Sequence, residues 1–321
     1  MVIAVTGGTG FLGTHTVSAL LRRGERVRLL ARDPARVPDG VDVVVGDVTD
    51  PVAVAALVDG ASAVLHAAGL YTFDSRRQSD LWRTNVLGTQ VVLDTAKVPV
   101  VHVSTVGTRF VEQPREAYLA SKVEAERIAR RRQAEGAPVI ITYPPALLGP
   151  DDPHLGDQNA RLRDLLRGLM PIWPSGGLPL GDVRDSAEQH ARILTGELSG
   201  PEFFGPATFL STREYLAAVR EVTGRRLPAV FLPARAMFPV GRLADALQRI
   251  WPWHLPAQYG AIYVCAVATP LAAPDTRPLA ETVGDTVAWL RATGALSGRQ
   301  AGCVTSGNAL VHPARRGKVQ S

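Results

Sequence analysis

The stretch Met1-Val-Ile-Ala-Val-Thr-Gly-Gly-Thr-Gly-Phe-Leu-Gly13 decides the fold. Val2–Thr6 is a short, largely β-branched run of the kind that forms a buried parallel strand. Glycines interrupt it, and an apolar pattern with helical spacing begins near Phe11. Glycines between a strand and a helix permit a tight turn, close approach of backbone to a pyrophosphate and close packing of the helix on the strand. The residues of the dinucleotide site predicted at this turn are Gly7, Gly10, Phe11, Leu12 and Gly13.

Strand and helix patterns alternate from this turn as far as Pro150, which is typical of an α/β fold with a doubly wound parallel sheet. Further strands are expected at residues 26–31, 41–45, 61–67, 98–104 and 138–143, the one at 41–45 being buried, with a long helix at 79–97. Beyond residue 150 we expect helices at 157–169, 185–195, 212–223, 235–250 and 279–293, and short strands at 203–210 and 229–232. The predicted parts are a nucleotide-binding domain over 1–150, a smaller α+β substrate lobe over 151–296 and a disordered tail over 297–321.

The composition is that of a globular protein, with 46% hydrophobic and 20% charged residues. Of the formal net charge of +5, the acid-free stretch 295–321 supplies +4 through three arginines and Lys318, which leaves +1 for the body. A nucleic-acid surface is therefore not expected. Cys265 and Cys303 show neither metal-ligand spacing nor a disulfide pattern, and no signal peptide precedes the first strand. These features predict a cytoplasmic protein without a metal site.

Residues 255–274 carry no charged side chain, which raises the question of a membrane segment. Pro256, Pro270 and Pro274 disfavour a spanning helix. We expect a core or substrate-facing segment here rather than membrane contact.

Residues at the ends of the next strands indicate the cofactor. The strand at 26–31 is followed by Arg32 rather than by the acid that binds the ribose 2′-hydroxyl in many NAD sites, so NADP is favoured over NAD. Asp47, followed by Val48, can bind an adenine amino group or cap the next helix, for which Asp50 is better placed. The small residues that would let the ribose pass are Ala67, Ala68 and Gly69, and His66 before them is expected to be structural.

The second informative stretch is Tyr118-Leu-Ala-Ser-Lys122, in which the two outer residues share one helix face. A tyrosine has a pKa of about 10, and a cation one helical turn away favours its phenolate, which suits the pair to proton transfer. Ser104 and Thr105 follow a buried strand, at the sheet edge where α/β proteins bind ligands.

Seven segments in order resemble the extended short-chain dehydrogenase/reductases, the NAD-dependent epimerase/dehydratase superfamily. They are TGGTGFLG from residue 6, GDVTD from 46, HAAG from 66, NVLGTQVVLDTA from 85, VSTVG from 103, Tyr118-x-x-x-Lys122 and PPALLGP from 144. The stretch RLLARDPARV from residue 28 is most similar to dihydroflavonol-reductase-like and 3β-hydroxysteroid-dehydrogenase-like members. The resemblance implies a Rossmann domain and NAD(P)-dependent oxidoreductase activity.

The resemblance also implies roles for individual residues. Tyr118 would give its proton to a carbonyl oxygen as hydride arrives, or accept it in the oxidation direction. Lys122 would favour the phenolate and bind the nicotinamide ribose, and Thr105, with Ser104 as the neighbouring alternative, would hold the substrate oxygen. Arg32 would meet the 2′-phosphate. The further cofactor contacts implied are Tyr118, Lys122, Pro144 and Leu147.

The predicted function is NADP-dependent interconversion of a carbonyl and an alcohol on a fairly apolar small molecule. Two alternatives stay open: a nucleotide-sugar epimerase or dehydratase with tightly bound NAD, and a non-catalytic NADP-sensing protein. Tyr143 and Ala146 stand where sugar-nucleotide epimerases usually carry arginine and asparagine, which weighs against the first. The presence of Tyr118 and Lys122 weighs against the second. By analogy with the family, helices at 79–97 and 118–134 would pair in a homodimer.

Overall fold

The computed structural model describes residues 1–72, 77–111, 114, 116–239, 241, 243 and 259–304. Seven parallel strands form its main sheet, in the order β10-β6-β5-β4-β1-β2-β3. They are β1 (Val2–Thr6), β2 (Arg26–Ala31), β3 (Asp42–Val45), β4 (Ala63–His66), β5 (Val100–Val103), β6 (Val139–Tyr143) and β10 (Glu202–Phe204). The doubly wound parallel sheet predicted from the sequence is confirmed.

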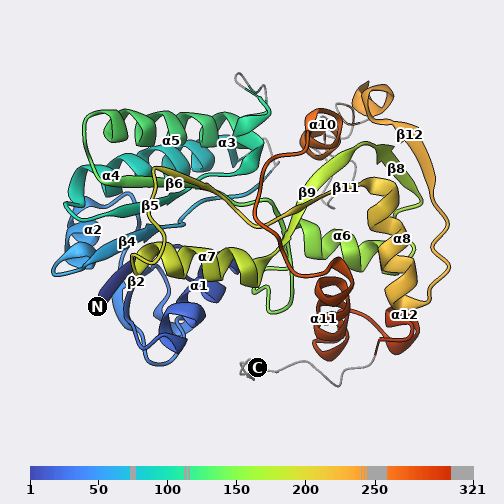
Figure 1. Ribbon diagram of the computed structural model, residues 1–321, viewed down its shortest axis with the longest axis horizontal. Helices are drawn as coiled ribbons and strands as arrows, with labels where there is room; N and C mark the ends of the chain where they lie inside the picture. The colour runs from blue at the N-terminus through green and yellow to red at the C-terminus, as the bar shows by residue number, and fades with distance from the viewer. Residues whose placement is uncertain are drawn as a thin grey trace, which may run out of the picture.

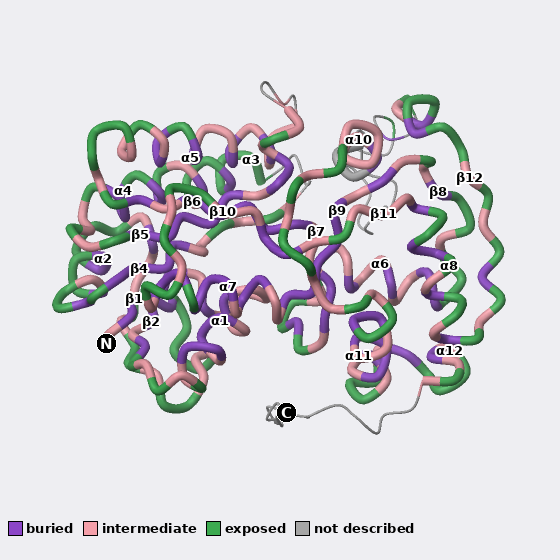
Figure 2. Tube along the Cα trace, viewed as in Figure 1, coloured by how far each residue is buried: buried purple, intermediate pink, exposed green. Residues whose placement is uncertain are grey.

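Helices cover both faces of this sheet (Figure 1). One face carries α1 (Phe11–Arg22) and α7 (Val183–Leu194), and the other carries α2 (Pro51–Val58), α4 (Gly88–Thr95) and α5 (Ala117–Ala134). The strands between them are largely buried (Figure 2). The strand order reverses between β1 and β4, so the carboxyl ends of these two strands flank the crevice where doubly wound sheets bind ligands.

Strand β3 departs from the expectation of a buried strand at 41–45. Val43 is 39% exposed and Val45 is 63% exposed. The reason is topological, because β3 is the last strand of the sheet and pairs with β2 alone.

The second half of the molecule has a core of its own, formed by residues such as Leu162, Trp173, Tyr215 and Val287. Its helices are α6 (Asp157–Leu166), α8 (Thr212–Thr223), α10 (Tyr259–Val267), α11 (Leu279–Ala292) and α12 (Gly298–Ala301). Its strands are β7 (Ala146–Leu148), β9 (Gly177–Asp182) and β11 (Thr208–Ser211) in one sheet, and β8 (Ile172–Ser175) and β12 (Val230–Pro233) in another. Within the described ranges, no helix is both long and apolar enough to span a membrane.

The single strand expected at 203–210 is in fact two strands in different sheets. Phe204 in β10 pairs with Tyr143 in the main sheet, whereas Thr208 in β11 pairs with Leu180 in the three-stranded sheet. Pro206 lies between them and cannot donate to a ladder, so the chain changes sheets there. Both α7 and β10 lie beyond residue 150 yet belong to the main sheet and its helix layer, and the division at 150 stays a prediction.

The sequence predicts a disordered tail from residue 297 onward, but the structure has an ordered segment at 297–304. Ser297 and Gln300 form a capping box that starts α12, and Ala301 is fully buried. The backbone N–H of Cys303 also donates to the carbonyl of Thr223 at 2.9 Å. Residues 305–321 lie outside the described residues, as do most of those in the helix expected at 235–250, whose start is the 3₁₀ turn η5 (Ala234–Met237).

We expect Gly13→Ala to destabilise the fold, because a Cβ at this position would lie 2.1 Å from the carbonyl oxygen of Gly7. Relief of such a backbone clash costs about 1–3 kcal/mol. Gly284→Ala is the matched control, since its Cβ would meet nothing nearer than Val222 at 3.8 Å within α11. Replacing a helical glycine there should stabilise by about 0.5–1 kcal/mol. Urea unfolding of both variants tests the contrast, and equal stability would contradict it.

Candidate active site at the carboxyl edge of the sheet

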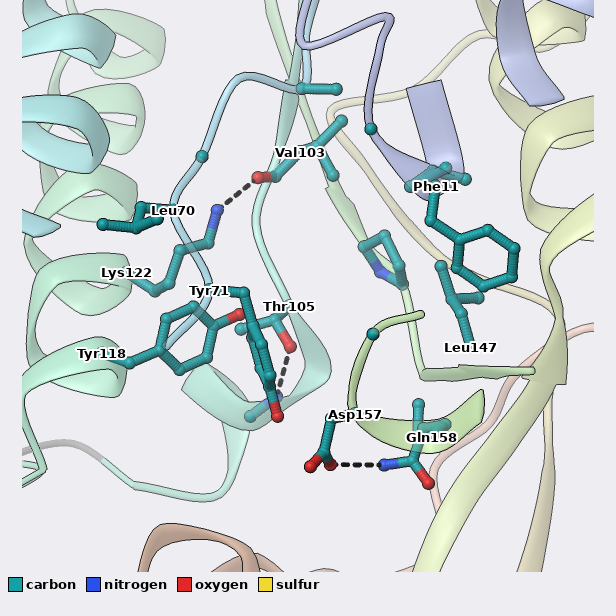
Figure 3. Close-up of a pocket in the computed structure, with 18 of the residues that line it drawn as sticks. Phe11, Leu70, Tyr71, Val103, Thr105, Tyr118, Lys122, Leu147, Asp157 and Gln158 are labelled. Atoms are coloured by element: carbon teal, nitrogen blue, oxygen red, sulfur yellow. Dashed lines mark hydrogen bonds between the residues drawn. The ribbon is translucent and has the colours of Figure 1, made fainter. Parts of the chain in front are cut away.

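A cavity of about 830 Å³ opens at the carboxyl edge of the main sheet and is lined by both halves of the molecule (Figure 3). All residues singled out from the sequence line it: Gly7, Gly10, Phe11, Leu12, Gly13, Arg32, Asp47, Val48, Ala67, Ala68, Gly69, Thr105, Tyr118, Lys122, Pro144 and Leu147. The second half contributes residues that were not singled out as a site, among them Asp157, Arg161, Tyr215 and Cys265.

The glycine turn after β1 is packed against the turn after β4. Gly7 has φ of +76°, and a Cβ on it would lie 2.4 Å from backbone atoms of Ala67 and Ala68. Gly10 precedes α1 and gives that helix no side-chain cap. The first N–H groups of α1 and the positive end of its dipole are therefore available at the cavity, which fits a pyrophosphate.

The far side of the glycine turn carries the residues expected at the adenosine. Arg32 is exposed and lines the cavity directly after β2. Asp47 accepts hydrogen bonds from the backbone N and the Oγ1 of Thr49, at 3.0 and 2.7 Å. Asp50 caps α2 by accepting from the N–H of Val52 at 2.9 Å, so the choice of Asp50 as the cap is confirmed.

Helix α5 places Tyr118 at the cavity. Its N-cap is Glu116, whose carboxylate accepts from the N–H groups of Tyr118 and Leu119 at 2.7 and 2.8 Å. Burial and then the charge of Glu116 raise the pKa of Tyr118 above its ordinary value, and a hydrogen bond with Thr105 opposes this rise. Tyr118 carries its proton at neutral pH, and stabilisation of its phenolate by Lys122 stays a prediction.

Lys122 lies one turn further along the same face of α5, and only 8% of it is exposed. Its Nζ donates to the carbonyl oxygen of Val103, at the end of β5, at 2.7 Å (Figure 3). Burial lowers the pKa of Lys122 to about 8, against the opposing charge of Glu126. The Nζ atom of Lys122 is thus held at the end of β5, one helical turn along α5 from Tyr118.

Glu126, one turn beyond Lys122, is the centre of a buried hydrogen-bond network that the sequence did not reveal. Its carboxylate accepts from Ser104 Oγ at 2.8 Å, Tyr143 OH at 2.9 Å and Arg130 Nε at 2.9 Å. Ser104 also lines the cavity, but its hydroxyl donates to Glu126, and Thr105 is the hydroxyl that bonds Tyr118. The i, i+4 spacing from Lys122 was the signal available for this residue.

Asn85 connects two of the segments that line the cavity. It lies in a π-helical turn, η3 (Trp82–Leu87), between α3 (Gln78–Leu81) and α4. Its amide bonds the backbone N and O of Leu70 at 2.7 and 3.1 Å and Ser121 Oγ at 2.9 Å. This connects the loop after β4 to α5. His66 is structural, as expected: its ring nitrogens contact Thr6 and Thr89, each at 2.9 Å, and burial lowers its pKa to about 3.

The fold and this site define an α/β enzyme that binds a nicotinamide dinucleotide. Residues 3–202 match the NAD dependent epimerase/dehydratase family, and the chain belongs to that family. It is an NAD(P)-dependent oxidoreductase of the extended short-chain dehydrogenase/reductase type. A putative dihydroflavonol 4-reductase of Synechocystis is 31% identical over 71% of this chain and 74% of its own.

Solved structures share the fold over nearly their whole length. The crystal structure of gox2253 is 25% identical, with a TM-score of 0.75, and the match covers 92% of this chain and 99% of that one. The Bordetella bronchiseptica enzyme WbmH in complex with NAD+ is 19% identical, with a TM-score of 0.67 and coverage of 91% and 99%. The likeness to WbmH concerns the fold alone.

The buried carboxylate of Glu126 should make stability depend on pH. Burial opposes its ionisation, but hydrogen bonds from Thr108, Ser104, Arg130 and Tyr143 hold its pKa below the ordinary 4.5. The stabilisation is therefore complete above about pH 4.5 and is lost as the pH falls through the lower folded pKa. Glu126→Gln should cost about 1–3 kcal/mol near neutral pH and progressively less below about pH 4.5.

Urea unfolding at a series of pH values measures this difference. Glu124→Gln is the matched control, because Glu124 lies on the same helix and meets Arg127 at the surface, where ion pairs contribute little. A cost for Glu126→Gln that stays constant down to acid pH would contradict the assignment.

Proposed function

We propose that this protein reduces a carbonyl group on a small molecule with NADPH, or oxidises the corresponding alcohol with NADP. The observation that carries the proposal is the arrangement of Tyr118, Thr105 and Lys122 at one end of a cavity whose other end is a glycine turn suited to a pyrophosphate. The tyrosine and the cofactor turn lie on opposite sides of the space that a nicotinamide and a carbonyl would share.

The chain's own groups fit the cofactor. The uncapped start of α1 would hold the pyrophosphate, and Asp47 would bind the adenosine. Arg32 would bind a 2′-phosphate, and Lys122 would bind the nicotinamide ribose. When bound, the reduced nicotinamide supplies the hydride that the carbonyl carbon accepts.

The protein supplies the proton and its control. Tyr118 is a phenol and therefore protonated at neutral pH, and it would donate its proton to the carbonyl oxygen. Thr105, already hydrogen-bonded to the phenol, would orient that oxygen. The ammonium of Lys122, held by the carbonyl of Val103, would stabilise the phenolate that remains.

Tyr118→Phe should lower kcat for ketone reduction by about two to four orders of magnitude, because the proton donor is lost while the ring is kept. Initial rates of NADPH oxidation against apolar ketones, aldehydes and steroids measure this effect. Tyr263→Phe is the matched control, since Tyr263 contacts Phe238 and does not line the cavity. Undiminished turnover in Tyr118→Phe would exclude Tyr118 as the proton donor.

Preference for NADP over NAD is proposed to depend on Arg32. Arg32→Gln should raise KM for NADPH about ten- to a hundredfold and leave KM for NADH nearly unchanged, because charge-assisted hydrogen bonds to the 2′-phosphate are lost. Arg36→Gln is the matched control: Arg36 lies on the same turn, 3.6 Å from Asp33, and does not line the cavity. Equal losses for both cofactors in Arg32→Gln would remove the basis for NADP preference.

The epimerase alternative has less support at this site. Tyr143, at the position where sugar-nucleotide epimerases usually carry arginine, is fully buried, and its hydroxyl contacts Glu126 rather than the cavity. A nucleotide-sensing protein would not need the tyrosine, threonine and lysine in one place. A cytoplasmic homodimer stays a prediction.

A further inference from the structure

The part of the cavity that the second half of the molecule lines contains an ion pair that the proposed chemistry does not use. Asp157 and Arg161 lie one turn apart on α6, and Arg161 Nε donates to Asp157 Oδ2 at 2.8 Å. Each side chain is 19% exposed, and both line the cavity. The pair therefore faces the space where a substrate would bind.

The surroundings of this pair are largely aromatic or apolar. The charge of Arg161 acts on Tyr71, Tyr215 and Cys265, which come from three other segments of the chain. Trp173 lies against Tyr215, with ring centroids 6.1 Å apart. Placing a guanidinium in such surroundings is costly unless its donors find acceptors.

Arg161 is only partly bonded within the described part of the chain. Its Nε is the one nitrogen with a hydrogen-bond partner there. Arg184 shows what a fully bonded guanidinium looks like in the same protein, because its Nε, Nη1 and Nη2 all donate to carboxylates of Asp182 and Asp285. The two terminal nitrogens of Arg161 are thus available to a ligand in the cavity.

Tyr71 links this pair to the proton donor. Its ring packs edge-on against that of Tyr118, with centroids 4.7 Å apart. Burial raises the pKa of Tyr71, and the negative charge of Asp157 raises it further. Figure 3 shows Tyr71 between Tyr118 and Asp157 along the cavity. A molecule whose carbonyl meets Tyr118 would extend past Tyr71 toward Arg161.

We propose that Arg161 binds a second oxygen acceptor on the substrate, so that the substrate is an apolar ketone or alcohol bearing an ester, amide or carboxylate oxygen. The planar fork of a guanidinium matches such an acceptor. Asp157 fixes the guanidinium through Nε and balances its charge, which lets uncharged acceptors bind as well as anionic ones. This inference rests on the proposed function, since it assigns the reacting carbonyl to Tyr118.

The test uses matched ketones that differ only in the second acceptor: 2-nonanone, ethyl 3-oxononanoate and 3-oxononanoate, with the 5-oxo homologues of the ester and the acid. Two measurements are made on each, kcat/KM for NADPH oxidation and the rise in melting temperature of the protein with NADP+. We expect the ester or the acid to be preferred over the plain ketone by about ten- to a hundredfold. The ester and acid arms distinguish an uncharged from an anionic acceptor.

Arg161→Gln should abolish this preference, so that kcat/KM for the ester and the acid falls to the value for 2-nonanone in the same variant. Arg161→Lys is the second variant, to be used if Arg161→Gln fails to fold. It keeps a charge beside Asp157 but lacks the planar fork, so it should also lose most of the preference. Arg163→Gln is the matched control, because Arg163 lies on the same helix, donates its Nε to Asp164 at 2.7 Å and does not line the cavity.

The outcomes separate this inference from the proposed function. Turnover that depends on Tyr118 without any preference for the second acceptor would overturn the inference and leave the proposed function standing. Stabilisation by the ester or acid that disappears in Arg161→Gln, without turnover of any ketone, would support the acceptor site and count against the reductase. If no compound gives either stabilisation or turnover, the inference is overturned. An undiminished preference in Arg161→Gln would also overturn it.

Discussion

The arrangement of the site depends on one backbone contact, between the turn after β1 and the turn after β4. Gly7 lies so close to Ala67 and Ala68 that no side chain fits between them. These two turns flank the reversal of strand order, so their contact sets the width of the crevice in which the cofactor would lie. Thr6 adds to it, since its Oγ1 accepts from the N–H of Ala68 at 3.3 Å and contacts His66 at 2.9 Å. The glycine turn thus positions α1 and also the loop that leads to Tyr71.

A second constraint acts through α5, which carries the phenol, the ammonium and a carboxylate on one face. Lys122 would lose its charge more readily in this buried place without the opposing effect of Glu126. Glu126 is itself kept ionised by its hydrogen bonds to Ser104, Arg130 and Tyr143. The charge state at the cavity therefore depends on a network behind the cavity wall. Positions that touch no ligand are in this way tied to the chemistry proposed for Tyr118.

The sequence predicted the nucleotide-binding half well because local rules dictate it. Strand, glycine turn and helix follow each other within residues 2–22, and each step has a period or a glycine that marks it. The prediction was wrong where burial or strand pairing depends on the place of a segment in the tertiary fold. The pattern at 41–45 suits a buried strand, and only the sheet order makes β3 an edge. Strands β7 and β8 are short, and β8 and β9 contain proline. Their partner strands lie far away in sequence, so no local pattern predicted them.

The same reasoning explains why the sequence indicated the proposed proton donor but not the proposed acceptor site. Tyr118 and Lys122 are four residues apart on one helix, so their proximity follows from helical geometry. Asp157 and Arg161 have the same spacing, yet most such pairs lie at the surface and contribute little. What sets this pair apart is the convergence of Tyr71, Tyr215 and Cys265 around it, from segments that only the fold brings together. The proposed reaction type thus follows from local spacing, whereas the proposed substrate preference depends on contacts between segments that are far apart in the sequence.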